Sequence, residues 1–112
     1  MTELPLGVDP SKCLIANQWV ASQSGVTLDL LNPSDGSALC AIARGNSEDI
    51  DLAVKAAEAA LDGEWGRLTA FERGRILYKI GTLVLENTEE LARLEALDVG
   101  KPLKQARADV VA

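Results

Sequence analysis

Short apolar runs separated by turn-type residues occupy the first third of the chain. Runs 14–16 and 19–20 flank the pair Asn17–Gln18, which is typical of a turn. Residues 26–31 alternate between apolar and polar, so that every second side chain lies on one face. We therefore expect a small hairpin over about 14–20 and a further strand over 26–31.

The strand over 26–31 stops at Asn32–Pro33, because proline cannot donate to a sheet ladder and restricts the residue before it. Ser34–Asp35–Gly36 supplies residues that tolerate tight-turn backbone angles. The apolar run 38–43 follows at once. The simplest continuation is an antiparallel return strand that ends before Arg44–Gly45.

After Gly45 the hydrophobic period changes to that of a helix. Asn46 or Ser47 is suited to accept the unpaired amides of a first turn, and the acids that follow suit the positive end of a helix. The helix is expected to end at Asp62–Gly63. One apolar face has a spacing of four, three and four residues: Ile50, Val54, Ala57 and Leu61.

A second helix is predicted after the short link 64–68. Thr69 and Glu72 match a capping box, in which hydroxyl and carboxylate satisfy first-turn amides. Helical spacing of apolar residues then continues to Glu86–Asn87.

Two more helices follow. Asn87–Thr88 is suited to end the second helix and to cap a third, which is expected to stop at Gly100. Pro102 fits the first turn of a fourth helix, which is expected to be cut at Ala112. The pattern predicts an α/β chain in which short antiparallel strands are followed by about four helices. Residues 1–13 are interpreted as a flexible amino-terminal arm and 14–112 as the folded part.

Charge and composition exclude several classes of protein. Eleven basic and seventeen acidic residues give a net charge of -6, which repels phosphate backbones, so no nucleic-acid partner is expected. The longest apolar run, 38–43, is far shorter than a membrane span, and the first ten residues lack the pattern of a secretory signal. The two cysteines do not form a CxxC motif, which favours a cytoplasmic location. With no histidine, Ser–His and Cys–His nucleophile activation is unavailable.

Three groups of residues invite a chemical interpretation. The segment Gly63–Gly66 lacks the GxGxxG spacing of a nucleotide loop and is better explained as a turn between helices. Cys13 and Cys40 are better explained as small core residues, and burial would raise the pKa of Cys40. The acids Glu89, Glu90, Glu95 and Asp98 raise the question of paired-carboxylate chemistry, against which stands a solvated helix surface for Glu89 and Glu90.

Three segments in order resemble signatures of the aldehyde dehydrogenase superfamily. They are LNPSDG at 31–36, WGRLTAFERGR at 65–75 and LEALDVGKP at 94–102. The similarity extends from about Leu14 to Ala112. Ser37 and Val99 depart from residues that are frequent in the family, which leaves the subfamily and the aldehyde open.

The resemblance implies that 14–112 form the opening part of a Rossmann-like cofactor domain in a longer enzyme, a homodimer or homotetramer. Such an enzyme oxidises an aldehyde to a carboxylic acid with NAD or NADP, through a catalytic cysteine and a glutamate base. The resemblance places those residues and the dinucleotide-binding residues beyond Ala112. No residue here is then catalytic or cofactor-binding, and this piece alone is expected to be inactive.

One feature of some family members falls within this chain. They hold a monovalent cation between main-chain carbonyls just before Asn–Pro and the aspartate of the Leu-Asp-x-Gly-Lys motif. The resemblance puts this site for K⁺ or Na⁺ at Leu30, Leu31 and Asp98, with a further ligand expected from sequence outside this chain. The chemistry agrees, since a hard cation prefers oxygen ligands. The alternative is that Asp98 caps or pairs with a neighbouring helix.

A different class of function also fits the sequence. A self-contained helical module without catalysis would dock a partner protein through its apolar faces. Such a module predicts a cooperative thermal transition for the isolated chain. The enzyme-piece hypothesis predicts apolar stripes left exposed on the helices.

Overall fold

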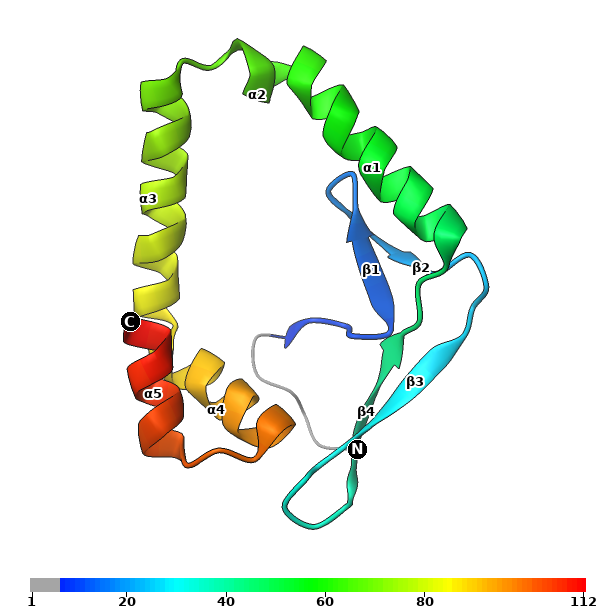
Figure 1. Cartoon of the computed structure of the whole chain (residues 1–112), viewed down its shortest axis with the longest axis vertical. Coiled ribbons are helices and arrows are strands. Elements are labelled where there is room, and N and C mark those ends of the chain that lie inside the picture. Colours follow the sequence, from blue (N-terminus) through cyan, green and yellow to red (C-terminus); the bar gives the residue numbers. More distant parts are fainter. Residues whose placement is uncertain (1–6) are drawn as a thin grey trace. The chain divides into compact units, whose positions relative to one another are not determined.

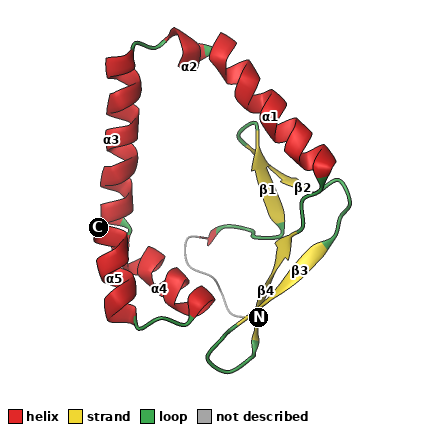
Figure 2. Ribbon diagram, in the orientation of Figure 1, coloured by secondary structure: helices red, strands yellow, loops and turns green. Residues whose placement is uncertain are grey.

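The computed structural model describes residues 7–112, drawn in Figures 1 and 2. Residues 1–6 of the predicted arm lie outside the described part. The chain divides into two compact units. The hairpin unit contains residues 9–28 and 41–75, and the helical unit contains residues 29–40 and 76–112 together with 7–8.

The predicted first hairpin is confirmed. Strand β1 (Lys12–Ile15) pairs antiparallel with β2 (Gln18–Ala21), with Lys12 opposite Ala21 and Ile15 opposite Gln18. The turn is Ala16–Asn17, one residue before the predicted pair Asn17–Gln18, and both residues have positive φ (50° and 62°), as a type I′ hairpin loop requires. Residues 12 and 13, at the end of the segment interpreted as an arm, are the first two of β1.

The predicted second strand pair is also confirmed. Strands β3 (Thr27–Leu31) and β4 (Ala38–Ala43) form a separate two-stranded sheet. Asn32 N donates to Ser37 O at 2.8 Å, and Arg44 N donates to Val26 O at 2.9 Å, which makes the pair antiparallel. In the turn, Gly36 has φ 74° and donates to Asn32 O at 2.7 Å.

Helix α1 (Ser47–Asp62) begins with a capping box in which Asn46, not Ser47, is the cap. The Asn46 side chain accepts from Asp49 N at 3.2 Å, and the Asp49 carboxylate accepts from Asn46 N at 2.8 Å. The other Asp49 oxygen accepts from Gln23 N at 2.9 Å, and Asp49 is only 3% exposed. One carboxylate therefore caps α1 and ties it to the loop after β2.

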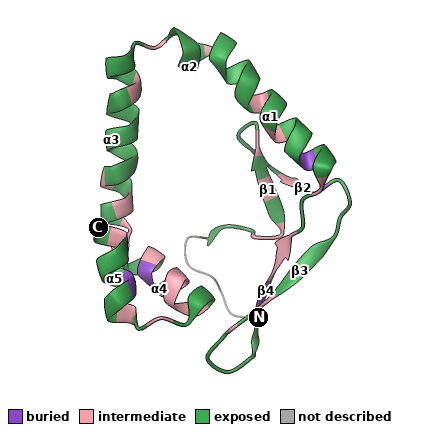
Figure 3. Cartoon of the chain, in the orientation of Figure 1, coloured by how far each residue is buried: buried purple, intermediate pink, exposed green. Residues whose placement is uncertain are grey.

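The apolar stripe predicted on α1 is exposed. Ile50, Val54 and Leu61 are 61%, 51% and 67% exposed. The less exposed side of the helix has Asp49, Ala53 and Ala56, four and three residues apart, and α1 contacts β1. A small-residue face packs in this unit, while the large-residue face remains open, as Figure 3 shows by colour.

Helix α3 (Ala70–Glu86) starts at the predicted capping box. Thr69 N donates to the Glu72 carboxylate at 2.8 Å, and Glu72 N donates to the Thr69 hydroxyl at 3.3 Å. Arg73 also donates to Leu68 O. These contacts are local, so the sequence alone places the start of the helix.

The prediction that Asn87–Thr88 ends α3 is confirmed, and Asn87 is also the N-cap residue of α4, but without the expected side-chain bond. Asn87 Nδ2 donates to Leu83 O at 2.7 Å, and Thr88 Oγ1 donates to Leu85 O at 2.6 Å. No Asn87 side-chain bond caps α4. Both side chains donate to carbonyl groups at the end of α3, which lie within one turn of them.

Helices α4 (Thr88–Val99) and α5 (Leu103–Val111) pack against each other. Ala92 and Ala106 are fully buried. Gly100, with φ 73°, ends α4 in the left-handed conformation, as predicted. Pro102 is the residue before the helix rather than part of its first turn, and its carbonyl accepts from Ala106 N at 3.1 Å.

The buried apolar residues are few. In the described part they are Leu39, Cys40, Ala92 and Ala106, all in the helical unit. None of the helices over residues 7–112 has the length and hydropathy that a bilayer crossing requires. The predicted order of short antiparallel strands followed by helices is confirmed, with one additional short helix.

Candidate functional site

The glycine segment 63–66 does not fit a dinucleotide phosphate. Glu64–Arg67 form α2, a helix of only four residues in the segment predicted as a link, and its first residue is an acid. A Cβ on Gly66 would stand 1.6 Å from Leu61 O, so glycine is required there for the chain to pass the end of α1. The segment is therefore a connection between helices, as interpreted from the sequence.

The cysteines are placed as small packed residues. Cys40 on β4 is buried, and this burial raises the pKa of its thiol, with a further contribution from the negative charge of Asp98. Cys13 on β1 is half-buried. A thiol with a raised pKa is a poor nucleophile at neutral pH, which agrees with the predicted core role of Cys40.

Two of the four acids in the acidic stretch of α4, Glu89 and Glu95, form ion pairs. Glu89 accepts two short bonds from Arg107 of α5, at 2.8 Å each. Glu95 accepts from Lys101 at 2.5 Å. A paired-carboxylate role for Glu95 and Asp98 is therefore disfavoured, because Glu95 is already neutralised by an ammonium group.

The candidate cation residues lie at the ends of two elements of the helical unit. Leu30 and Leu31 are the last residues of β3, and Asp98 is in the last turn of α4. Two observations indicate that the end of β3 and the end of α4 lie close together. A Cβ on Gly100 would lie 2.9 Å from Pro33 Cγ, and the charge of Asp98 acts on Cys40, which belongs to the strand beside β3.

Asp98 is exposed, at the position where α4 ends. The dipole of α4 adds to the negative charge of Asp98, and no side chain caps the start of the neighbouring helix α5. The salt bridges within residues 7–112 do not include Asp98. Carbonyl and carboxylate oxygens are suitable ligands for K⁺ or Na⁺, so the donor set fits.

Sequence reasoning missed one cluster beside this position. Lys101 Nζ, in the turn between α4 and α5, donates to Glu95 at 2.5 Å and to Asp109 at 2.6 Å. Gln105 also donates to Asp109 at 2.9 Å. The bond with Asp109, and then that with Glu95, raises the pKa of Lys101, while Lys101 lowers the pKa of Asp109. The pairs span six and eight residues across a turn, a separation that helical periodicity does not reveal.

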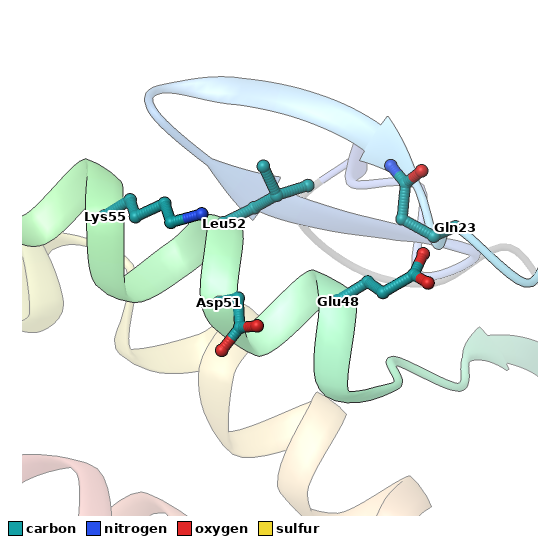
Figure 4. Close-up of a pocket in the computed structure, with 5 residues that line it drawn as sticks. All are labelled: Gln23, Glu48, Asp51, Leu52 and Lys55. Carbon is teal, nitrogen blue, oxygen red and sulfur yellow. The ribbon is translucent and has the colours of Figure 1, made fainter.

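Two surface hollows are shallow and carry no convergent chemistry. One, of about 280 Å³, lies beside the first half of α1. Figure 4 shows Glu48 directed toward Gln23, with Asp51 on a different side of the helix. The other, of about 380 Å³, lies between α3 and α5 and is mostly apolar. The described residues contain no cluster of three side chains suited to a metal.

Comparison with known proteins places the chain in a family. Residues 19–112 match the aldehyde dehydrogenase family. Human mitochondrial 10-formyltetrahydrofolate dehydrogenase is 47% identical over 92 residues, which cover 81% of this chain and 10% of that protein. Rat mitochondrial aldehyde dehydrogenase is 45% identical over 94 residues, covering 82% and 18%.

Solved structures agree. An aldehyde dehydrogenase from Bacillus cereus superposes with a TM-score of 0.85 at 40% identity, over 90% of this chain and 21% of that one. Staphylococcus aureus betaine aldehyde dehydrogenase, in complex with NAD⁺, gives 0.84 at 36%, over 90% and 20%. The chain thus spans about a tenth to a fifth of the length of these relatives. The superposition confirms the fold expected from the resemblance, and the chain belongs to the aldehyde dehydrogenase family.

Proposed function

We propose that this chain is part of an enzyme that oxidises an aldehyde to a carboxylic acid with NAD⁺ or NADP⁺. The observation that carries the proposal is the family match over 19–112. When bound, the dinucleotide accepts a hydride. It is held by residues outside this chain, since the only glycine segment that suggested a phosphate loop does not fit one.

The 112 residues supply structure rather than catalytic groups. Support comes from the buried Cys40 and from the carboxylates engaged in ion pairs on α4. The exposed apolar side chains of α1 and α3 are suited to pack against further parts of the enzyme. The partners in this proposal are the remainder of the enzyme and further copies, as a cytoplasmic homodimer or homotetramer.

A monovalent cation, K⁺ or Na⁺, is part of the proposal. The carbonyls of Leu30 and Leu31 and the carboxylate of Asp98 would hold it. The cation would tie the end of β3 to the end of α4 by charge neutralisation, without entering the reaction. This role fits an acid at the negative end of a helix.

A chimeric enzyme tests the main proposal. Residues 19–112 replace the matching segment of the Bacillus cereus enzyme, and NADH formation from propanal and NAD⁺ is measured for the chimera, for the same enzyme without the segment and for the 112-residue chain. We expect turnover by the chimera alone. Turnover by the 112-residue chain would overturn the structural role, and an inactive but folded chimera would overturn the family function.

A further inference from the structure

We propose that Lys101 is a positioning residue that sets the affinity of the cation site without touching the ion. The inference rests on the cation site proposed above. Lys101 follows Asp98 by three residues and Gly100 by one. Its ammonium group is the only link that joins the turn 100–102 to side chains of both α4 and α5 within the described residues.

The clamp formed by Glu95, Lys101 and Asp109 is well placed to hold this turn. Its two contacts, at 2.5 and 2.6 Å, are short, and the Lys101 side chain is 28% exposed. Charge-assisted bonds from one ammonium to two carboxylates restrict its rotamers more than a single surface pair would. Fixing Lys101 fixes the course of the chain out of α4.

That course decides where Asp98 lies relative to β3. α4 ends at Gly100, whose position next to Pro33 leaves no room for a Cβ. Pro33 is two residues after Leu31, whose carbonyl is one of the proposed ligands. A turn released from its clamp would therefore shift the carboxylate against the carbonyls, and ligand spacing governs affinity for a hard cation.

Electrostatics alone predicts the opposite effect of a Lys101 substitution on cation affinity. Replacing Lys101 by methionine removes a positive charge near the site, which by itself would strengthen cation binding. Replacing Arg107 by methionine removes one positive charge too, and it also breaks a contact between α4 and α5, to Glu89. Arg107→Met is thus a matched control for charge and for loss of a helix–helix ion pair.

The test measures Na⁺ binding to the folded chimeric enzyme described above, which supplies ligands from outside residues 19–112, from the sodium NMR linewidth, with K⁺ as competitor and choline chloride holding the ionic strength constant. We expect Lys101→Met to weaken binding about tenfold, as is usual for partners that orient metal ligands. Arg107→Met should leave affinity unchanged or slightly tighter, and Lys101→Arg should restore most of it. Circular dichroism records the helix content of each variant.

The outcomes separate the positioning role of Lys101 from the existence of the cation site. If Lys101→Met binds Na⁺ as tightly as the unchanged chimera or tighter, or if Arg107→Met loses as much affinity, the positioning role is overturned while the cation site stands. If the unchanged chimera shows no saturable binding, or binding that Asp98→Asn does not reduce, the cation site fails and the role of Lys101 fails with it. Should Lys101→Met lose helix content, Lys101→Gln decides, because it also removes the positive charge and both charge-assisted contacts while keeping a polar side chain, and equal or tighter binding by it overturns the positioning role.

Discussion

The helix pair α4–α5 and the helix α1 are held in opposite ways. Between α4 and α5, two alanines are fully buried and the ion pairs of Lys101 and Arg107 join the helices. On α1, contact with its unit comes from Asp49 and small residues, while Ile50, Val54 and Leu61 are exposed. On α1 the residues with the most apolar surface thus contribute least to the packing of its unit.

The difference shows why an apolar stripe indicates a helix but not its partner. Burying a leucine stabilises a fold by roughly 1.5–3 kcal/mol, so large side chains are the ones that a complete enzyme would bury. The alanines of α4 and α5 serve close approach inside one local pair instead. Substitutions that add bulk, remove a cap or add charge should therefore change the stability of the two regions to different extents.

The largest effect is expected for Ala92→Leu. Ala92 is fully buried on α4, so a larger side chain must push α5 away, which costs about 1–3 kcal/mol. Urea unfolding followed by circular dichroism measures the loss. The control is Ala57→Leu on the exposed stripe of α1, which should change stability by less than about 0.5 kcal/mol. Equal effects at both positions would contradict the comparison.

Gly100→Ala is expected to cost about 1–2 kcal/mol for the left-handed backbone alone, with a further penalty from the contact with Pro33. Gly81→Ala is the matched control, because it lies within α3 with nothing inside 4 Å of its added Cβ. It should stabilise the helix by roughly 0.5–1 kcal/mol. Thermal unfolding of both variants measures opposite shifts, and a loss at Gly81 would show that its surroundings are not open.

Asn46→Ala should destabilise the start of α1 by about 1 kcal/mol, since the Asn46 side chain accepts from two first-turn amides. Ser47→Ala tests the other residue that the sequence allowed as a cap, and it should cost less. Hydrogen exchange of the amides of Glu48 and Asp49 locates the effect. If Ser47→Ala proved the more damaging change, the assignment of the cap would be wrong.

Local chemistry explains how much of the fold could be predicted. The strand 38–43, the Thr69–Glu72 capping box and the end of α4 at Gly100 depend on neighbours a few residues apart, and all three are confirmed. The Asn46 cap was one of two alternatives, because both residue types can accept the same amides. Gln23 N, 26 residues away, adds a contact to Asp49 that no local pattern reveals.

The candidate site was harder to predict from the sequence, because no local pattern connects its residues. Leu30, Leu31 and Asp98 came from resemblance, since backbone carbonyls leave no signature in side chains. Lys101 was missed because its partners are separated by a turn. Asn87 was expected to cap α4, but it uses its amide group on α3, a choice between two nearby helix ends that composition does not decide.

A smaller effect on stability, with a large effect on assembly, is expected for the double variant Val54→Lys and Leu61→Lys. Both side chains are more than half exposed, so unfolding of the 112-residue chain should change by less than about 0.5 kcal/mol. In the chimeric enzyme the same lysines would be buried without partners and should abolish turnover. A chimera that keeps its activity would show that the stripe does not pack in the enzyme.

The smallest effect concerns the pH dependence of the α4–α5 ion pairs. The bond from Arg107 lowers the pKa of Glu89, so its contribution is present above the unfolded pKa of about 4.3 and is lost as pH falls through the folded value. The urea midpoint of Glu89→Gln should therefore lie slightly below that of the unchanged chain at neutral pH, and the two should converge below about pH 4. Glu90→Gln, whose carboxylate makes no ion pair within residues 7–112, is the control and should show no such convergence. If the difference between the two urea midpoints persists unchanged in acid, Glu89 acts through packing rather than charge. Ion pairing by Glu89 would then no longer distinguish the α4–α5 pair from α1.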